Sequence, residues 1–258
     1  RPGAGRAVAL ASALLEDESE GVRSLAARVL AGLSGRGLGG AVAEVSRRLQ
    51  HERADVRWAA LLALPEVAAV GDKRAIVELS AQLEHGNTDV RRAAVEGLAK
   101  VVRKGDEHAV KAVLARMEHE DLGVRRSASQ ALFAITKKGD QNALAQVIEL
   151  MEHKSADVKQ TALDALLELV ENDDEPTFNK VSRRLAHPSS DVRRMALAAL
   201  ATMAARGHDS AMLVINERLE ARSPQVREAA TQALADAGGL WMLNRHERGP
   251  VSLGEQKK

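Results

Sequence analysis

The sequence predicts an all-α protein built as an α-solenoid, an array of stacked helix pairs. The first observation is a valine that returns every 34 residues without insertion or deletion, as from Val22 to Val56 and on to Val90. A fixed period of this length is typical of supersecondary units that stack on one another. The second observation is that the apolar residues around each valine follow helical spacing. We therefore expect seven helix pairs followed by an irregular C-terminal tail.

Each valine begins the second helix of a pair. Alanine follows it four residues later and leucine eight residues later, as in Val56, Ala60 and Leu64. These spacings trace one stripe of an α-helix, which we expect to be buried. Aspartate often stands directly before the valine, as at Asp55 and Asp89. Its carboxylate is suited to accept the free N–H groups of the first turn, so it is predicted to cap this helix.

The first helix of each pair carries its own apolar stripe. In the third repeat the stripe is Ala75, Ile76, Leu79 and Leu83, and steps such as Gly71-Asp72 supply a helix-ending glycine and then a cap. We expect a solenoid domain over 1–237 and an extended or disordered tail over 238–258. The predicted pairs occupy roughly 4–34, 38–69, 72–103, 106–137, 140–171, 174–205 and 208–237.

The composition agrees with stacked helices. The 258 residues include two Phe, two Trp and no Tyr, too few aromatic side chains to anchor a bulky central core. Small apolar faces suit repeats that are stabilised by their neighbours. The formal net charge of +1 gives no global attraction for nucleic acid or anionic lipid. The lack of cysteine excludes disulfides, thiolate metal ligands and a cysteine nucleophile, and no apolar run approaches the length of a membrane span.

The second helices carry a resemblance to a known family. Segments 89–98 (DVRRAAVEGL) and 191–200 (DVRRMALAAL) resemble HEAT repeats, particularly the short HEAT-like repeats of phycobilin lyases. The resemblance covers residues 4 to about 237. It implies a stack of helix pairs that acts as a scaffold or adaptor. It also implies two alternatives, a bilin lyase or bilin-binding chaperone, and a nucleic-acid-binding solenoid similar to the HEAT-like DNA glycosylases.

One feature departs from that family. HEAT units typically place aspartate five residues before the valine, whereas this chain places histidine there in five repeats. A metal site needs ligands that converge within about 2.0–2.1 Å of one ion. Equivalent positions of stacked helices lie roughly 10 Å apart, so we expect these histidines to be structural and predict no metal site. They are His51, His85, His119, His153 and His187.

No motif predicts catalysis. Residues 35–40 contain a formal G-x-G-x-x-G, but a helix is expected before it, whereas the dinucleotide fingerprint follows a strand. Acidic residues such as Asp164 and Glu168 lie near the end of the second helix of the fifth pair, where they are expected on a solvated face. No spacing of Ser, His and Asp is diagnostic. We predict that the protein is not an enzyme and has no catalytic residue and no cofactor.

The predicted partner surface lies on the second helices. Positions two, six and nine after each valine should face away from the core, on the side that lines the concave face of a solenoid. In the second repeat these positions are Trp58, Leu62 and Pro65. Exposed apolar side chains of this kind, tryptophan above all, are favoured interface anchors. We therefore predict that these three residues bind a partner.

Two further groups are assigned to the partner surface. Arg92, Arg126 and Arg194 form a basic stripe at the position two residues after the valine. Leu10 and Leu14 stand in the first helix where most later repeats have polar residues, and Trp241 lies beyond the last predicted helix. Terminal repeats normally present a polar cap, so apolar residues at both ends predict contacts with a partner.

The sequence therefore predicts a non-catalytic protein-binding scaffold or a structural subunit of a larger assembly. It would bind through the second-helix face and the ends of the chain. The expected partners are proteins, probable members of a multi-subunit complex that could itself be membrane-bound, and not nucleic acid. The chain begins with Arg1-Pro2 rather than methionine, from which we expect a longer precursor and an intracellular, organellar location.

Overall fold

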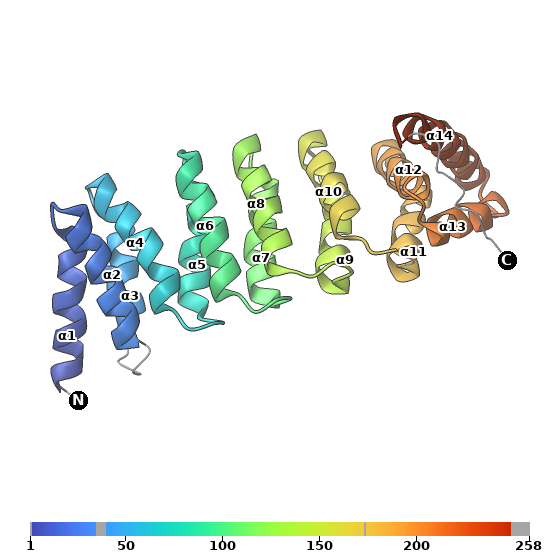
Figure 1. Ribbon diagram of the computed structural model, residues 1–258. Helices are drawn as coiled ribbons and strands as arrows, with labels where there is room; N and C mark the ends of the chain where they lie inside the picture. Colours follow the sequence, from blue (N-terminus) through green and yellow to red (C-terminus); the bar gives the residue numbers. More distant parts are fainter. Residues whose placement is uncertain (1, 35–39, 173, 249–258) are drawn as a thin grey trace, which may run out of the picture. The chain divides into compact units, whose positions relative to one another are not determined.

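The computed structural model describes residues 2–34, 40–172 and 174–248, and the side chains of 2–4, 34 and 239–248 are outside that description. The described residues form fourteen α-helices and three short 3-10 segments, with no β-strand among them (Figure 1). The all-α prediction is confirmed. None of the described helices is long and apolar enough to cross a membrane.

The chain divides into two compact units, Arg1–Lys137 and Lys138–Lys258. The helices of the first unit alternate between a first and a second member of each pair. They are α1 (Pro2–Ala13), η1 (Leu14–Glu16), α2 (Glu20–Ser34), α3 (Ala41–Arg48), α4 (Ala54–Val67), α5 (Lys73–Gln82), α6 (Thr88–Val101), α7 (Glu107–Leu114), η2 (Ala115–Glu118) and α8 (Leu122–Ile135). Within this unit α1, α3, α5 and α7 contact one another in series, and so do α2, α4, α6 and α8. The result is two layers of helices.

The second unit repeats this layered plan. Its helices are α9 (Gln141–Leu150), α10 (Ala156–Leu169), α11 (Glu175–Arg183), η3 (Arg184–Ala186), α12 (Ser190–Ala205), α13 (Asp209–Leu219) and α14 (Pro224–Arg248). Here α9, α11 and α13 form one layer, and α10, α12 and α14 form the other. The number of seven repeats stays a prediction.

The core lies between the two layers of each unit. Val56, Ala60 and Leu64 on α4 are all fully buried, as the helical stripe predicts. The last helix differs from this pattern. On α14 the fully buried side chains include Ala233 and Ala237, whereas Leu234 is 36% exposed. Helix α14 is the last helix in the described part of the chain, and there the alanines are buried while the leucine that the stripe predicts to be buried is partly exposed.

The turns between pairs form as the sequence predicts. Gly71, Gly105 and Gly139 adopt positive φ angles of 88°, 80° and 71°, a region that side chains disfavour. The residue after each glycine caps the next helix. For example, the Asp72 carboxylate accepts the N–H of Ala75 at 3.0 Å. These caps fix where each first helix begins.

The predicted cap directly before the valine is wrong. Helices α4 and α6 each begin two residues earlier than expected, so that Asp55 and Asp89 lie inside the first turn. On α6 the cap is Asn87, whose side-chain oxygen accepts the N–H of Asp89 at 2.7 Å. The aspartates are thereby free to contact other side chains.

The expected boundary at residue 238 also differs from the structure. The backbone of α14 remains helical through Gly238 and Gly239 to Arg248. Two glycines cost a helix about 1 kcal/mol each, but Leu, Met, Arg and Glu, which favour helices, follow them. Trp241 therefore lies on helical backbone, with its side chain outside the described part. Residues 249–258 are outside it altogether.

Candidate functional site

On α4 the positions two and six after the valine are exposed, as predicted, whereas the position nine after it, Pro65, is not. Trp58 and Leu62 on α4 are 37% and 48% exposed. At the same two positions α6 carries Arg92 and Glu96, which are exposed and polar. Helix α4 therefore presents an aromatic and an aliphatic side chain where the next second helix presents charges. Pro65 is half-buried, and a Cβ atom at Gly97 on α6 would lie 3.6 Å from its ring, so it packs against that helix.

A groove of about 390 Å³ opens beside Trp58, between α4 and the turn that joins α5 to α6. The wall from α4 is partly apolar, with Trp58 and Leu61, and the opposite wall is mostly polar. The lining residues are Ala54, Asp55, Arg57, Trp58, Leu61, Gln82, His85, Asn87, Asp89 and Val90. The exposed side chain of Trp58 thus stands at a cavity large enough for one or two side chains.

The groove opens where a contact between neighbouring repeats is missing in the described structure. One repeat earlier, the Arg23 guanidinium lies 3.1 Å from the Asp55 carboxylate. The equivalent residues here are Arg57 and Asp89. Asp89 instead accepts a hydrogen bond from Arg92 at 3.0 Å, and Arg57 and Asp89 both line the groove. A partner can therefore reach a cation and an anion that the fold has not paired with each other.

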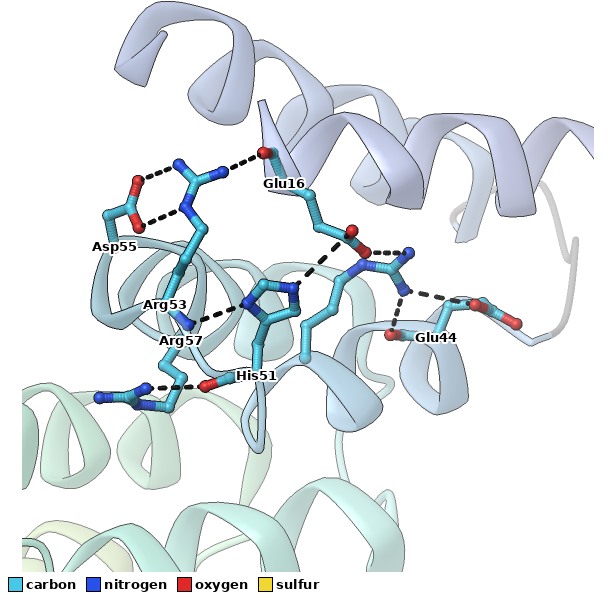
Figure 2. Close-up of polar contacts among 7 residues, drawn as sticks. Glu16, Glu44, His51, Arg53, Asp55 and Arg57 are labelled. Atoms are coloured by element: carbon cyan, nitrogen blue, oxygen red, sulfur yellow. Dashed lines mark hydrogen bonds and ion pairs between the residues drawn. The ribbon is translucent and has the colours of Figure 1, made fainter. Parts of the chain in front are cut away.

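Arg57 is held in place by its own loop. Its Nη1 atom donates to the carbonyl oxygen of His51, as Figure 2 shows, and to that of Glu52, both at 2.7 Å. Arg91 and Arg125 make the same contact with the carbonyls of His85 and His119, at 2.8 and 2.9 Å. The arginine after each of these valines thus satisfies carbonyl groups in the turn between the two helices of its pair. These hydrogen bonds hold the guanidinium in place through Nη1.

Asp55 belongs to a network of ions beside the groove. Arg53 donates to both of its carboxylate oxygens, at 2.7 and 3.2 Å, and reaches the Glu16 carbonyl at 2.8 Å (Figure 2). The hydrogen bonds from Arg53 lower the pKa of Asp55, with help from the charges of Arg53 and Arg23. The same pairing raises the pKa of Arg53. Asp55 is therefore a stable anion, neutralised by its neighbours.

The histidines have the structural role that was predicted for them. In each of the five, Nδ1 accepts the backbone N–H two residues later, at 3.0 to 3.1 Å; Figure 2 shows this for His51 and Arg53. Nδ1 is therefore unprotonated and the proton of the neutral ring is on Nε2. His51 also places Nε2 3.8 Å from Glu16. A histidine here closes the turn in the way that an aspartate would.

The basic stripe is only partly assembled. Arg92 and Arg126 are exposed on α6 and α8 of the first unit. Arg194 lies on α12 of the second unit, where it pairs with Asp191 at 2.8 Å. Two of the three predicted cations thus already have an anionic partner on their own helix, because Arg92 pairs with Asp89. This weakens their attraction for an external anion.

The first helix pair exposes more apolar surface than was predicted. Leu10 and Leu14 are 64% and 48% exposed, and on α2 Leu25 and Val29 are 57% and 44% exposed. Sequence reasoning missed the second two residues. A signal was available, because the equivalent positions in the next two repeats hold only Ala59, Ala63, Ala93 and Gly97.

In each unit the first helices of the pairs form one layer and the second helices form the other. Contacts between successive helices of a layer recur from pair to pair, which defines a helical-repeat protein. The family model for HEAT repeats matches residues 7–99 and 76–167. Together these ranges cover more than half of the chain, so the chain belongs to the HEAT-repeat family.

The chain is also similar, at low sequence identity, to solved structures. The archaeal HEAT-like repeats protein from Thermococcus onnurineus NA1 is 13% identical, with 88% of this chain and 99% of that chain covered and a TM-score of 0.38. The complex of CpcE and CpcF of phycocyanin lyase from Nostoc sp. PCC7120 is 21% identical, with 90% and 93% covered and a TM-score of 0.37. No curated protein matched the chain significantly.

Proposed function

We propose that this protein is a non-catalytic scaffold that binds a protein partner at the groove beside Trp58. The observation that carries the proposal is the exposed pair Trp58 and Leu62 next to a cavity of about 390 Å³. Tryptophan is among the residues that most often dominate binding energy at interfaces, especially beside a pocket. The 37% of Trp58 that is exposed is available to a partner, while the rest of the residue contacts its own protein.

The groove also defines the chemistry of the partner. Trp58 and Leu61 offer an apolar wall for a large aliphatic or aromatic side chain. Arg57 and Asp89 stand at the same groove and can orient polar groups that flank it. A peptide segment that carries an apolar anchor beside a carboxylate or amide meets both requirements. Small polar rims of this kind contribute more to specificity than to affinity.

The charges favour a protein over the two alternatives from the family resemblance. The groove contains the carboxylates of Asp55 and Asp89 beside one guanidinium, that of Arg57. This balance gives no excess positive charge for the propionates of a bilin. Nucleic-acid binding would require cations free to contact phosphates, whereas Arg92 and Arg194 are paired with aspartates.

The proposal is tested by comparing Trp58→Ala with Val77→Ala. Val77 is a matched control because it is 51% exposed on α5, away from the groove. Partners are captured from the native source by affinity purification, identified by mass spectrometry and then titrated in purified form. Trp58→Ala should weaken binding by about 2 kcal/mol or more, roughly thirtyfold, and Val77→Ala should not.

Equal affinity of the two variants for every purified partner would contradict the proposal. Incubation with a bilin provides the second arm of the test. A shift of the bilin absorbance that is lost in Trp58→Ala would assign the groove to a tetrapyrrole instead.

A further inference from the structure

A small ion cluster recurs between neighbouring pairs, around the ends of the first helices. At the first junction the Glu16 carboxylate lies 2.9 Å from the guanidinium of Arg48 and 3.8 Å from Nε2 of His51. A histidine at this turn thus faces a carboxylate of the preceding pair, which an arginine also contacts. The equivalent contacts are Glu84 with Arg116 at 2.9 Å, and Glu152 with Arg184 and His187 at 3.0 and 3.7 Å.

Both charged partners of this cluster are replaced at the junction between the second and third pairs. Gln50 stands at the position of the glutamate and Gln82 at that of the arginine, whereas His85 keeps the histidine. Gln82 and His85 line the groove beside Trp58. Within the described part of the chain, neither of these two side chains pairs with a carboxylate. The groove therefore lies where other junctions hold a glutamate.

His85 has one ring N–H group with which to bind a ligand. Its Nδ1 accepts the backbone N–H of Asn87 at 3.0 Å, so the proton of the neutral ring is on Nε2. The amide of Gln82 adds two further N–H donors on the same wall of the groove. This wall thus offers donors to an acceptor that the preceding pair does not supply.

Arg57 brings a cation to the groove from α4. One repeat earlier, Nη1 of Arg23 donates to the carbonyl oxygens of Asp17 and Glu18 at 2.8 and 2.9 Å, and it also lies 3.1 Å from the Asp55 carboxylate. Arg57 makes the two equivalent carbonyl contacts but, among the described residues, no ion pair. An arginine held by its turn in this way can bind a carboxylate as well.

We propose that the groove binds a carboxylate of the partner, from an aspartate or glutamate that stands next to an apolar side chain. Arg57 and His85 donate hydrogen bonds to the carboxylate, and the apolar side chain packs against Trp58. The inference rests on the proposed function, because it names the chemistry of the partner at the same groove.

The two aspartates that line the groove leave room for one further anion. Arg53 donates to the Asp55 carboxylate at 2.7 Å, and Arg92 lies 3.0 Å from the Asp89 carboxylate. Each aspartate is thus neutralised by an arginine close to it in the chain. The charge of Arg57 is balanced by neither, so the groove matches a single carboxylate.

The first test uses short fluorescein-labelled peptides with a central leucine or phenylalanine in a Gly-Ser background. One residue beside the apolar side chain is Glu, Gln or Lys. Binding to the full chain is measured by fluorescence anisotropy. The glutamate peptide should bind about tenfold more tightly than the glutamine peptide, because hydrogen bonds to a charged acceptor are stronger, and the lysine peptide should bind most weakly. Equal binding of all three, or binding of none, would overturn the inference.

The second test removes the two donors. His85→Asn keeps a short side-chain acceptor at the turn but removes the Nε2–H, and it should weaken binding of the glutamate peptide about tenfold. The control is His119→Asn, at the equivalent turn of the next repeat. Arg57→Gln should weaken binding at least as much. Its control is Arg193→Gln on α12, because Arg193 makes the same two carbonyl contacts, both at 2.8 Å.

Stability and binding are measured together for these four variants. Thermal denaturation followed by circular dichroism shows whether each groove variant is as stable as its control. Unchanged affinity of the glutamate peptide for both His85→Asn and Arg57→Gln would contradict the proposed contacts.

The third test supplies the missing carboxylate from the chain itself. Gln50→Glu restores the glutamate that faces the histidine at other junctions, and this carboxylate should compete with that of the glutamate peptide. Binding of the glutamate peptide should weaken, and binding of the glutamine peptide should not. Gln225→Glu adds the same charge at an exposed site on α14 and should change neither. If Gln50→Glu binds the glutamate peptide as tightly as wild type, the inference fails.

The inference and the proposed function can fail separately. Trp58→Ala removes the apolar anchor whatever the charge of the partner, so it reports on the proposed function. If Trp58→Ala weakens binding of the purified native partner but the peptides show no preference for glutamate, only the carboxylate inference is wrong. If Trp58→Ala leaves binding of that partner unchanged, the groove is not its site and the proposed function is wrong.

Discussion

The backbone N–H of Gly105 donates a hydrogen bond to the carbonyl oxygen of Ile135, at 2.9 Å. Gly105 lies in the turn before α7, and Ile135 is the last residue of α8, so the bond ties the start of a pair to its end. Gly71 makes the same bond to Val101 at 2.6 Å. In both cases the positive φ of the glycine aims the N–H at that carbonyl.

Replacement of Gly105 by alanine should therefore destabilise the protein by about 1–2 kcal/mol, because an L-residue at φ 80° brings its Cβ close to the carbonyl oxygen. Chemical denaturation measures the change. Gly86→Ala is the control, since a Cβ there meets no atom within 4 Å. Equal midpoints for the two variants would show that the turn is not constrained.

Loss of a turn histidine should also destabilise the protein. Nδ1 of His119 accepts the N–H of Asp121 at 3.0 Å, and its removal in His119→Ala should cost about 1 kcal/mol. His119→Asn keeps an acceptor on a short side chain and should recover most of the loss. The exposed His108 on α7 is the control for the loss of an imidazole. If Asn and Ala were equally unstable, the hydrogen bond would not be the cause.

Truncation of Leu64 should cost the protein far more stability than truncation of Leu62 on the same helix. Leu64 is fully buried, and Leu64→Ala should cost about 2–5 kcal/mol through lost burial and the cavity that remains. Leu62 is 48% exposed, and Leu62→Ala should change stability by no more than about 0.5 kcal/mol. Thermal and chemical denaturation of both variants provide the comparison. A large loss in Leu62→Ala would mean that this side chain serves the core rather than a partner.

Removal of the Arg53 side chain should raise the pKa of Asp55. Hydrogen bonds from Arg53 are the main reason why the pKa of this carboxyl lies below its ordinary value. An Asp with a lowered pKa in the folded state contributes stability above its unfolded pKa, and that stability is lost as the pH falls through the folded pKa. Carbon-13 NMR titration of Asp55 in wild type and Arg53→Ala measures the shift. An unchanged titration would assign the lowered pKa to Arg23 instead.

Local chemistry explains which features the sequence could predict. The 34-residue period, the glycine–aspartate turns and the exposure of Trp58 and Leu62 depend on helical spacing and on residues close in the chain. The cap at Asp55 was predicted wrongly, because α4 begins two residues earlier than expected, and its carboxylate contacts Arg53 and Arg23 instead. Arg23 comes from the preceding repeat, and a rule based on neighbouring residues does not include it.

The sequence by itself determined that this chain is a stack of helix pairs and which side of each helix faces outward. Only the tertiary structure decided which polar contacts form between neighbouring repeats. Asp89 accepts a hydrogen bond from Arg92, and a groove lined by Arg57 and Asp89 lies beside Trp58. Likewise, only the structure shows how far Leu25 and Val29 on α2 are exposed. Both outcomes arise from contacts between repeats, and the repeat pattern is the same whether or not such a contact forms.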